Sequence, residues 1–458
     1  MIRRKADEQI RNFMLHDRRS LLVTGARQVG KTFSIRKVGK ECFENVVEIN
    51  FVEQPEAIAM FSEQKGAKDL LLRISAFTKK ALAPGKTLIF FDEVQECKEI
   101  VTAIKFLVDE GSYKYAMSGS LLGVELDDLR SVPVGYMDEI EMYPLDLLEF
   151  FEAIGIGTNV VDHLRRSFEE KRPVDNFIHK RMLEAVRLYL IVGGMPAAVQ
   201  QYLDTNNLRK VYTEQRGIIR TYKKDITKYA LGRKLQIEEI YDLIPSELNA
   251  KNKRFILKEL NEKARFSKYE DSFLWLRDAG VAIPAYSIEE PRVPLLLNKQ
   301  RNLFKLFLND VGLLAAMYGG NIQTKLLSQD SNINFGSVFE NLVAQELYAH
   351  GFAEQQHSLY YFNSKKQGEL DFVVEYDGNV LPIEVKSGKD YERHNALTNV
   401  MANGEYGVPS AYVFCQENVQ TKGRIIYYPI YMITFFEQIQ TEETTYKFDL
   451  TGLGSIGL

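Results

Sequence analysis

The chain has 458 residues, of which 45% are hydrophobic and 26% are charged, as in globular proteins and unlike disordered, collagen-like or disulfide-scaffolded chains. Lys and Arg number 58 against 62 Asp and Glu, so the net charge of -4 excludes a chain that coats nucleic acid with uniform positive charge. Three separated cysteines, no apolar run of about 20 residues and no apolar segment behind the charged first residues predict a cytoplasmic protein without disulfides, membrane span or signal peptide.

Residues 1–145 show short apolar runs that alternate with helical patterns, which predicts the α/β class and a parallel sheet. We expect strands at 20–24, 45–51, 87–91 and 113–117, and helices at 68–82 and 99–110. The run at 87–91 reads TLIFF, as expected for a strand that is buried on both faces of the sheet. We assign these elements to one domain.

A glycine-rich turn follows the first strand. Residues 25–32 read GARQVGKT, which is the P-loop spacing of Gly, four residues and Gly-Lys-Thr between a strand and a helix. In such a loop the backbone N–H groups and the N-terminus of the helix bind phosphates. Lys31 is expected to reach the β- and γ-phosphates of ATP, and Thr32 to give its hydroxyl to Mg²⁺. The predicted ATP-binding residues are Gly25, Ala26, Arg27, Gln28, Val29, Gly30, Lys31, Thr32 and Phe33.

Two carboxylates end the apolar strand at 87–91. Asp92 suits an outer-shell contact to Mg²⁺, and Glu93 suits the general base that orients the attacking water, so the pair predicts hydrolysis of the nucleotide. The alternative is a solvated strand end. The next strand ends in Ser118-Gly119-Ser120, and either Ser118 or Ser120 is expected to hold the water or the γ-phosphate, because ligands of open α/β sheets bind at the carboxyl ends of strands.

The motifs GARQVGKT, TLIFFDEVQ, YKYAMSGS, DEIEMYPLDLLEF, YLIVGGMPAAV and TYKKDITKYA resemble the prokaryotic AAA-type ATP-binding proteins that carry a C-terminal domain of unknown function. The resemblance extends over nearly the whole chain. It implies an AAA-like core, a helical lid, a winged helix and a nuclease-like C-terminal fold, and it suggests an oligomer. The family commonly has Gly-Arg where this chain has Gly135-Tyr136. Arg130 is the candidate substitute, as a sensor or as a finger in trans, and its alternative is a surface arginine.

Charge is distributed in blocks. Residues 88–160 hold 15 acidic and 4 basic residues, whereas residues 207–268 hold 16 basic and 8 acidic ones. The blocks indicate separate structural units with separate partners. The alternatives are that each block is a solvated face, or that one face docks on the other. Residues 146–245 read as almost entirely helical and form the predicted lid, with a break at residues 193–196.

Residues 246–320 read as two helices followed by two strands, which is a winged-helix pattern. Glu270 and Asp271 begin the second helix and would repel DNA, so the alternatives are DNA contact and a structural or protein-docking role. The residues that could track phosphates are Lys251, Lys253, Arg254, Lys258, Lys263, Arg265 and Lys268.

Residues 321–458 read as one helix followed by strands. Asp371 precedes a strand, and Glu384 and Lys386 share one face of the next strand. With Glu340 on the preceding helix, this arrangement resembles the PD-(D/E)xK nuclease fold, in which Glu340, Asp371 and Glu384 would hold a second divalent metal and Lys386 would assist catalysis. The alternatives are a capping box for Glu340 and an ordinary surface ion pair for Glu384 and Lys386.

The sequence therefore predicts a Mg²⁺-dependent ATPase that couples its nucleotide state to a winged-helix and nuclease-like module and acts on DNA. The alternative is an ATP-dependent switch or scaffold that recruits a protein partner and has a catalytically inert C-terminal fold.

Overall fold

The N-terminal residues form a five-stranded parallel sheet in the computed structural model, which describes residues 2–62, 66–79, 81–120, 135–229, 232–250, 255, 266–320, 325–327, 335–353 and 358–439. The strands are β1 (Ser20–Thr24), β2 (Asn45–Asn50), β3 (Thr87–Asp92), β4 (Lys114–Ser118) and β5 (Met137–Glu141). Their order is β2-β3-β4-β1-β5, and every neighbouring pair is parallel. The predicted α/β class and the four predicted strands are confirmed. The edge strand β5 was not predicted, because its acidic residues interrupt any apolar pattern.

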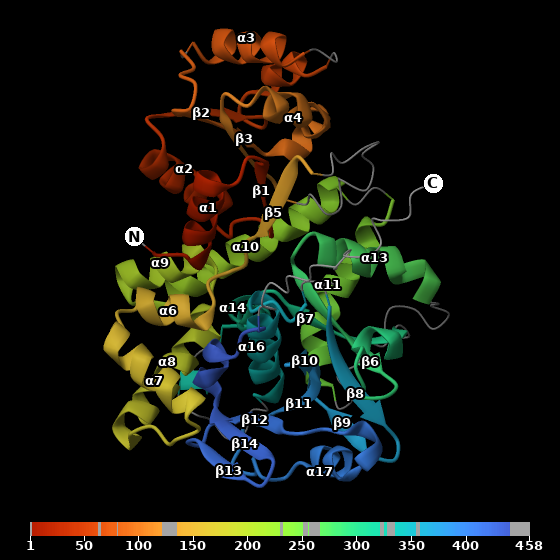
Figure 1. Cartoon of the computed structure of the whole chain (residues 1–458). Coiled ribbons are helices and arrows are strands. Elements are labelled where there is room, and N and C mark those ends of the chain that lie inside the picture. The colour runs from red at the N-terminus through yellow and green to blue at the C-terminus, as the bar shows by residue number, and fades with distance from the viewer. Residues whose placement is uncertain are drawn as a thin grey trace, which may run out of the picture.

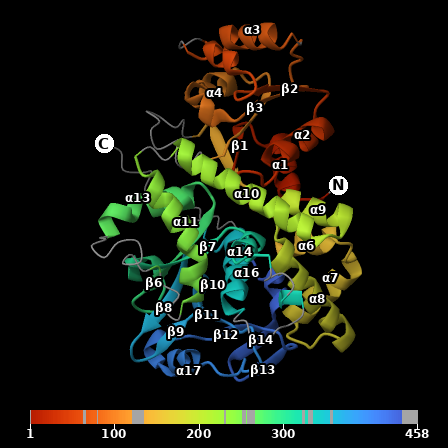
Figure 2. The same ribbon diagram turned by 180° about the vertical axis from the view of Figure 1, so that it is seen from behind.

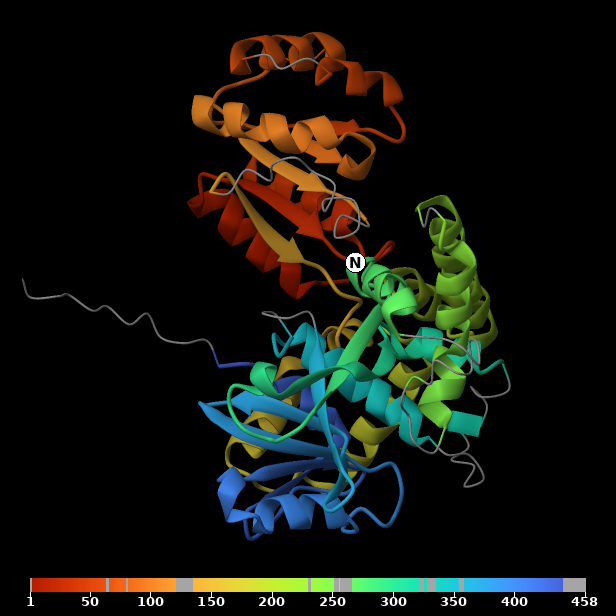
Figure 3. The same ribbon diagram turned by 90° about the vertical axis from the view of Figure 1, so that its right-hand side faces the viewer.

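Helices cover both faces of this sheet, as the side view in Figure 3 shows. They are α1 (Lys5–His16) and α2 (Lys31–Cys42) on one face, and α3 (Ala67–Thr78) and α4 (Lys98–Glu110) on the other. Alternate residues of β1 enter different cores: Leu21 and Val23 belong to the core with α1 and α2, and Leu22 belongs to the core with α3 and α4. With both faces covered, the carboxyl ends of the strands are left as the place for a ligand.

The following region is helical, as predicted. It comprises α6 (Leu147–Ala153), α7 (Thr158–Glu169), α8 (Asn176–Val192), α9 (Pro196–Thr205), α10 (Leu208–Tyr229) and α11 (Lys234–Asn249). Figures 1 and 2 show α10 lying between the N-terminal sheet and the C-terminal elements. In the described part of the chain no single helix is long and apolar enough to cross a membrane, and α8 with α9 meets this test of length and composition only as a pair bent by 119°.

The predicted wing is part of a larger sheet. After α13 (Phe266–Asp278), β6 (Ala282–Ile288) and β7 (Lys299–Leu308) form an antiparallel hairpin, as expected. However, β6 also pairs in parallel with β8 (Leu359–Ser364), which pairs with β9 (Gly368–Leu370), so the sheet crosses the predicted boundary at residue 320. The first predicted helix, at 252–263, lies outside the described residues apart from Phe255, and the winged helix stays a prediction.

The C-terminal residues add a second sheet of mixed direction. Its order is β10-β11-β12-β14-β13, with antiparallel pairs at both edges and parallel pairs at the centre. The elements are α14 (Val311–Met317), α16 (Gly336–Ala349), β10 (Phe372–Tyr376), β11 (Asn379–Val385), α17 (Asn395–Ala402), β12 (Ala411–Cys415), β13 (Gln420–Lys422) and β14 (Ile425–Pro429).

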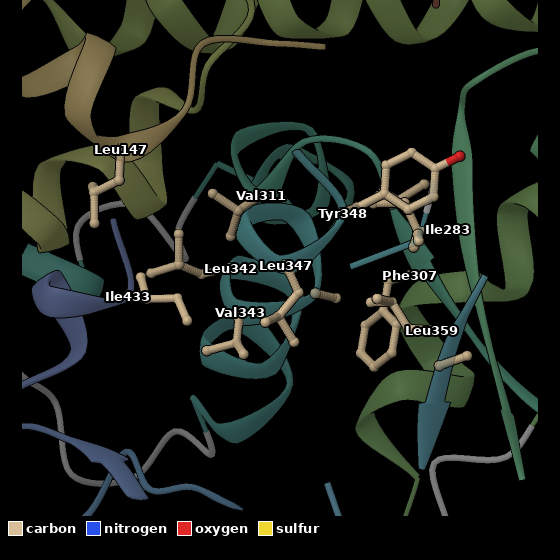
Figure 4. Packing of buried hydrophobic residues seen from close by; sticks show 14 of the residues in the cluster. Leu147, Ile283, Phe307, Val311, Leu342, Val343, Leu347, Tyr348, Leu359 and Ile433 are labelled. Atoms are coloured by element: carbon tan, nitrogen blue, oxygen red, sulfur yellow. The ribbon is translucent and has the colours of Figure 1, made fainter. Parts of the chain in front are cut away.

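Helix α16 is the centre of the C-terminal core. Residues 337–348 are all buried, as expected for a helix that is surrounded by other elements on every side. Figure 4 shows Leu342, Val343 and Leu347 of this helix between Ile433 and Leu147 on one side and Phe307 and Leu359 on the other. Segments from the helical region, the β6–β7 hairpin and the C-terminus therefore pack on one helix.

A buried carboxylate joins the helical region to α14. Asp310 is fully buried; its Oδ1 accepts a hydrogen bond from the N–H of Leu313 at 2.8 Å, and its Oδ2 accepts one from the N–H of Gly194 at 2.5 Å. The first bond caps α14, and the second satisfies the break between α8 and α9. One side chain thus serves two backbone segments that are 116 residues apart.

We expect Asp310→Ala to lower the free energy of unfolding by about 2–3 kcal/mol, because two buried N–H groups lose their acceptor. Urea denaturation followed by circular dichroism measures the change. Asp162→Ala removes an exposed carboxylate from α7 and is the matched control, with an expected change below about 0.5 kcal/mol. Equal midpoints for the two variants would contradict the role of Asp310.

Candidate nucleotide site

The P-loop lies at the carboxyl end of β1 and leads directly into α2. Gly25 has φ +119°, and a Cβ there would stand 2.1 Å from the carbonyl oxygen of Met142, so only glycine fits beside this segment. Gly30 precedes the first residue of α2 in a left-handed conformation. Among the predicted ATP-binding residues Val29 is fully buried, whereas Phe33 is 51% exposed beside the loop. The loop and the helix N-terminus thus form the predicted cradle for phosphates.

Lys31 points back into its own loop. Its Nζ donates hydrogen bonds to the carbonyl oxygens of Gly25 at 2.9 Å and Ala26 at 2.8 Å. Burial lowers the pKa of Lys31 to about 8, although the carboxylates of Glu93 and Asp92 oppose the shift. The ammonium is therefore held by neutral acceptors, which an anion can replace.

Asp92 is the centre of a hydrogen-bond cluster at the carboxyl edge of the sheet. The Thr32 hydroxyl lies 3.1 Å from both carboxylate oxygens, the Ser118 hydroxyl donates to Oδ1, and Nδ2 of Asn50 donates to Oδ2 at 3.0 Å. Burial raises the pKa of Asp92, and the hydrogen bond from Ser118 opposes this. The structure thus brings together Thr32, Asp92 and Ser118. Asn50 was missed, although it ends the strand beside β3 and pairs in register with Asp92.

These side chains fit a magnesium ion. A hydroxyl and a carboxylate that meet beside a phosphate cradle are the oxygen donors that Mg²⁺ prefers, with phosphate and water completing its shell. Thr32 and Asp92 would hold the ion, which would neutralise phosphate charge. In the described residues no three His, Cys, Asp or Glu side chains are grouped to hold a metal, which agrees with a site that depends on the nucleotide for further ligands.

Glu93 lies directly beyond β3 in a left-handed conformation, with φ 58°. Its Oε2 accepts a hydrogen bond from Nε2 of Gln95 at 2.5 Å. A non-glycine residue held in this conformation is strained, and such strain concentrates at functional sites. Ser120 is buried two residues beyond β4.

Position 136, where the resembling family commonly has an arginine, lies far from the P-loop. The backbone oxygen of Tyr136 accepts from the N–H of Ser20, so Tyr136 lies at the amino end of β1, at the opposite edge of the sheet from the P-loop. A side chain there could not act on a nucleotide bound by its own chain. Arg130 lies outside the described residues, and its role as a sensor or finger stays a prediction.

Helix α10 is attached to the nucleotide site at three points that the sequence did not reveal. Arg27 of the P-loop forms an ion pair with Asp225, and its carbonyl oxygen accepts a hydrogen bond from the Tyr222 hydroxyl at 3.2 Å. Behind Glu93, Glu96 forms an ion pair with Lys228 at 2.7 Å. The helix therefore contacts both the phosphate loop and the segment of the expected general base.

The β6–β7 hairpin also reaches the P-loop. Gly280 begins the turn into β6, and a Cβ at this position would lie 3.0 Å from the backbone nitrogen of Ala26. Any larger residue would push the turn away from the loop. The C-terminal elements thus touch the phosphate cradle directly.

The four residues of the predicted nuclease-like site lie near one another. Glu384 is buried and forms an ion pair with Lys386 at 2.8 Å, and Oδ2 of Asp371 accepts from the N–H of Val385 at 2.8 Å. Burial and the charge of Asp371 raise the pKa of Glu384 to about 8. Burial alone would lower the pKa of Lys386, but the carboxylates of Glu384, Asp371 and Glu340 raise it.

A fifth residue changes the interpretation of this site. Lys305 of β7 is fully buried, and its Nζ lies 2.8 Å from Oε1 of Glu369. Burial alone would lower its pKa, but Glu340, Glu369 and Asp371 outweigh that effect and raise it. The sequence signal was a lysine inside the apolar run LFKLFL. Lys305 and Lys386 thus add two ammonium groups among these carboxylates. In the described residues no group of His, Cys, Asp and Glu side chains that could hold a metal ion is found, and the second divalent metal stays a prediction.

Comparison with protein families supports an AAA-type ATPase. Residues 17–151 match the model of an AAA domain. Residues 183–324 and 335–433 match two domains of unknown function, DUF8612 and DUF4143. The first match supports ATP binding by the N-terminal domain, and the other two assign no activity. A search of curated proteins gave no match.

Several solved structures are distantly similar. A Walker-type ATPase from Pyrococcus abyssi has 15% identity and a TM-score of 0.41, with 69% of this chain and 96% of that chain covered. A RuvB variant from Thermotoga maritima has 13% identity and a TM-score of 0.30, with 64% and 91% covered. Cdc6p from Pyrobaculum aerophilum has 12% identity and a TM-score of 0.27, with 72% and 96% covered.

We expect the affinity for ATP to fall about tenfold between pH 7 and pH 9, because the free protein loses the Lys31 proton near pH 8 and must regain it to bind the phosphates. Titration calorimetry in buffers of different ionisation enthalpy measures both the affinity and the proton uptake. Lys31→Arg keeps its charge over this range, so any binding by that variant should not depend on pH. Constant affinity of the unmodified chain would contradict the role of Lys31.

Proposed function

We propose that the chain binds Mg²⁺-ATP at residues 25–33 and hydrolyses it. The observation that carries the proposal is the meeting of Thr32, Asp92 and Ser118 beside a P-loop whose own carbonyl groups hold Lys31. In this reaction Lys31 moves from those carbonyls to the β- and γ-phosphates, and Thr32 and Asp92 hold the Mg²⁺. Glu93 orients the attacking water as general base, and Ser118 or Ser120 steadies the water or the γ-phosphate.

In this proposal the chain uses the energy of ATP hydrolysis to act on DNA. Support comes from the basic block at 207–268, since part of it lies on α10, and α10 is attached to Arg27 and Glu96 of the nucleotide site. A change at the phosphates can therefore reach the helical region through the same ion pairs. The winged helix and a ring-shaped oligomer belong to this proposal as further predictions.

We expect Glu93→Gln to bind ATP and to hydrolyse it about 10²–10³ times more slowly, because a general base contributes about that factor. Steady-state phosphate release and filter binding of labelled ATP separate the two effects. Lys31→Ala should lose binding itself. Glu99→Gln, an exposed carboxylate in the first turn of α4, is the matched control and should hydrolyse normally. Normal turnover by Glu93→Gln would remove Glu93 from the mechanism.

A second candidate function is an ATP-dependent switch or scaffold that recruits a protein partner and has an inert C-terminal fold. The observation that favours it is the burial of Lys305 among Glu340, Glu369 and Asp371. An internal lysine supplies part of the positive charge that a divalent cation would otherwise bring to these carboxylates. In this alternative the C-terminal domain binds a partner and cuts nothing.

In this alternative we expect the full chain to leave supercoiled, linear and branched DNA uncut in the presence of ATP and either Mg²⁺ or Mn²⁺, because Lys305 and Lys386 already pair with carboxylates of the cluster. Gel electrophoresis measures the outcome. Lys386→Ala is the control for contaminating nucleases, which would cut equally in both preparations. Metal-dependent cleavage that disappears in Lys386→Ala would instead establish the nuclease.

A further inference from the structure

A basic cleft lies between α10 and α11. Its volume is about 550 Å³, within the usual range of ligand sites. Met317 and Tyr318, at the C-terminal end of α14, complete its wall. Figure 2 shows α10 and α11 near one another, below the N-terminal sheet in that view. Arg216, Arg220 and Lys223 line the cleft from α10, Asp242 lines it from α11, and Tyr318 follows α14.

The charges of this cleft are not balanced within the described part of the chain. Lys223 forms an ion pair with Asp242 at 2.6 Å, which accounts for one basic and one acidic group. Arg216 and Arg220 are exposed, and no carboxylate among the described residues lies within ion-pair distance of either. Their i, i+4 spacing places two like charges side by side, which destabilises an isolated helix. Two arginines in this arrangement can bind one anion together.

The cleft also offers an aromatic surface. Tyr318 is half-buried, and its hydroxyl is held by the carbonyl oxygen of Pro245 at 2.9 Å and by the Ser337 hydroxyl at 3.1 Å. These bonds fix the ring in place. Arginines beside an aromatic ring are the combination that binds single-stranded nucleic acid, because the guanidinium groups pair with phosphates and the ring stacks on a base.

The same helix leads from the cleft to the nucleotide site. Lys223 stands between Tyr222, which donates to the carbonyl oxygen of Arg27, and Asp225, which pairs with the Arg27 guanidinium. The α10 wall of the cleft and the residues that hold the P-loop thus belong to one continuous stretch of α10.

We propose that the α10–α11 cleft binds the phosphates of single-stranded DNA through Arg216 and Arg220, with a base against Tyr318. Stacking on Tyr318 requires an unpaired base, which the interior of a duplex does not offer. The inference deepens the proposed function, since it places the DNA of that proposal at one site, next to the helix that contacts Arg27.

The test uses the full chain and a fluorescent oligothymidylate of about 12 nucleotides, with anisotropy measured over a range of salt concentrations. The Arg216→Ala/Arg220→Ala variant should bind at least tenfold more weakly. Its slope of log K against log salt should fall by about 1.4, which is two phosphate contacts on a single strand. Arg209→Ala/Lys210→Ala removes the same charge from exposed positions of α10 outside the cleft, and its affinity should change less than threefold.

Three results would overturn the proposal. They are an equal loss of affinity in both double variants, equally tight binding of a blunt duplex, and equally strong competition by polyglutamate of the same charge. The last result would point to an acidic protein segment. ATP hydrolysis is measured on the same preparations. If Arg216→Ala/Arg220→Ala hydrolyses ATP normally and binds DNA as tightly as the unmodified chain, the cleft proposal is wrong and the proposed function stands. If the unmodified chain binds DNA through the cleft but does not hydrolyse ATP, the proposed function is wrong and the cleft proposal stands.

Discussion

A buried charged group must be hydrogen-bonded or paired with an opposite charge, and the kind of partner determines whether the site can still bind a charged ligand. At the N-terminal sheet the partners are neutral: the carboxylate of Asp92 accepts from hydroxyl and amide groups, and the ammonium of Lys31 donates to two backbone carbonyls. Neutral partners hold a charge without cancelling it. A magnesium ion and a phosphate can therefore replace them with a gain in electrostatic energy, and the P-loop is ready for that exchange.

In the C-terminal cluster the buried charged groups are paired with opposite charges instead of neutral groups. Here Lys305 is within reach of Glu340, Glu369 and Asp371, and Lys386 is paired with Glu384. Opposite charges cancel each other, and removing one of them leaves the other buried and unpaired at a large energetic cost. Lys305 is the buried charge in this cluster that the pattern of the C-terminal carboxylates did not reveal.

The parts of this description that the sequence predicted are those encoded by local spacing. The P-loop, Asp92 and Glu93 lie within short motifs, and the inner strands β1 and β3 contain short apolar runs. The missed residues depend on distant neighbours: Asn50 is 42 positions from Asp92, and Asp225 is 198 positions from Arg27. The role of Lys305 was missed for the same reason, because Lys305 meets Glu369 only when the β6–β7 hairpin pairs with β8. No pattern within one segment contains that information.

Helix α10 contacts the P-loop and also lines the basic cleft. A ligand shifts a conformational equilibrium only by as much as it binds the two states differently. Arg27 and Lys31 belong to one loop, and phosphates that attract both side chains compete with Asp225 for the first. The strength of the pair between Arg27 and Asp225 therefore depends on what the P-loop holds. Lys223 and Asp225 lie two residues apart on α10, and if the cleft binds DNA as proposed, any coupling between the cleft and the P-loop must be equal in both directions.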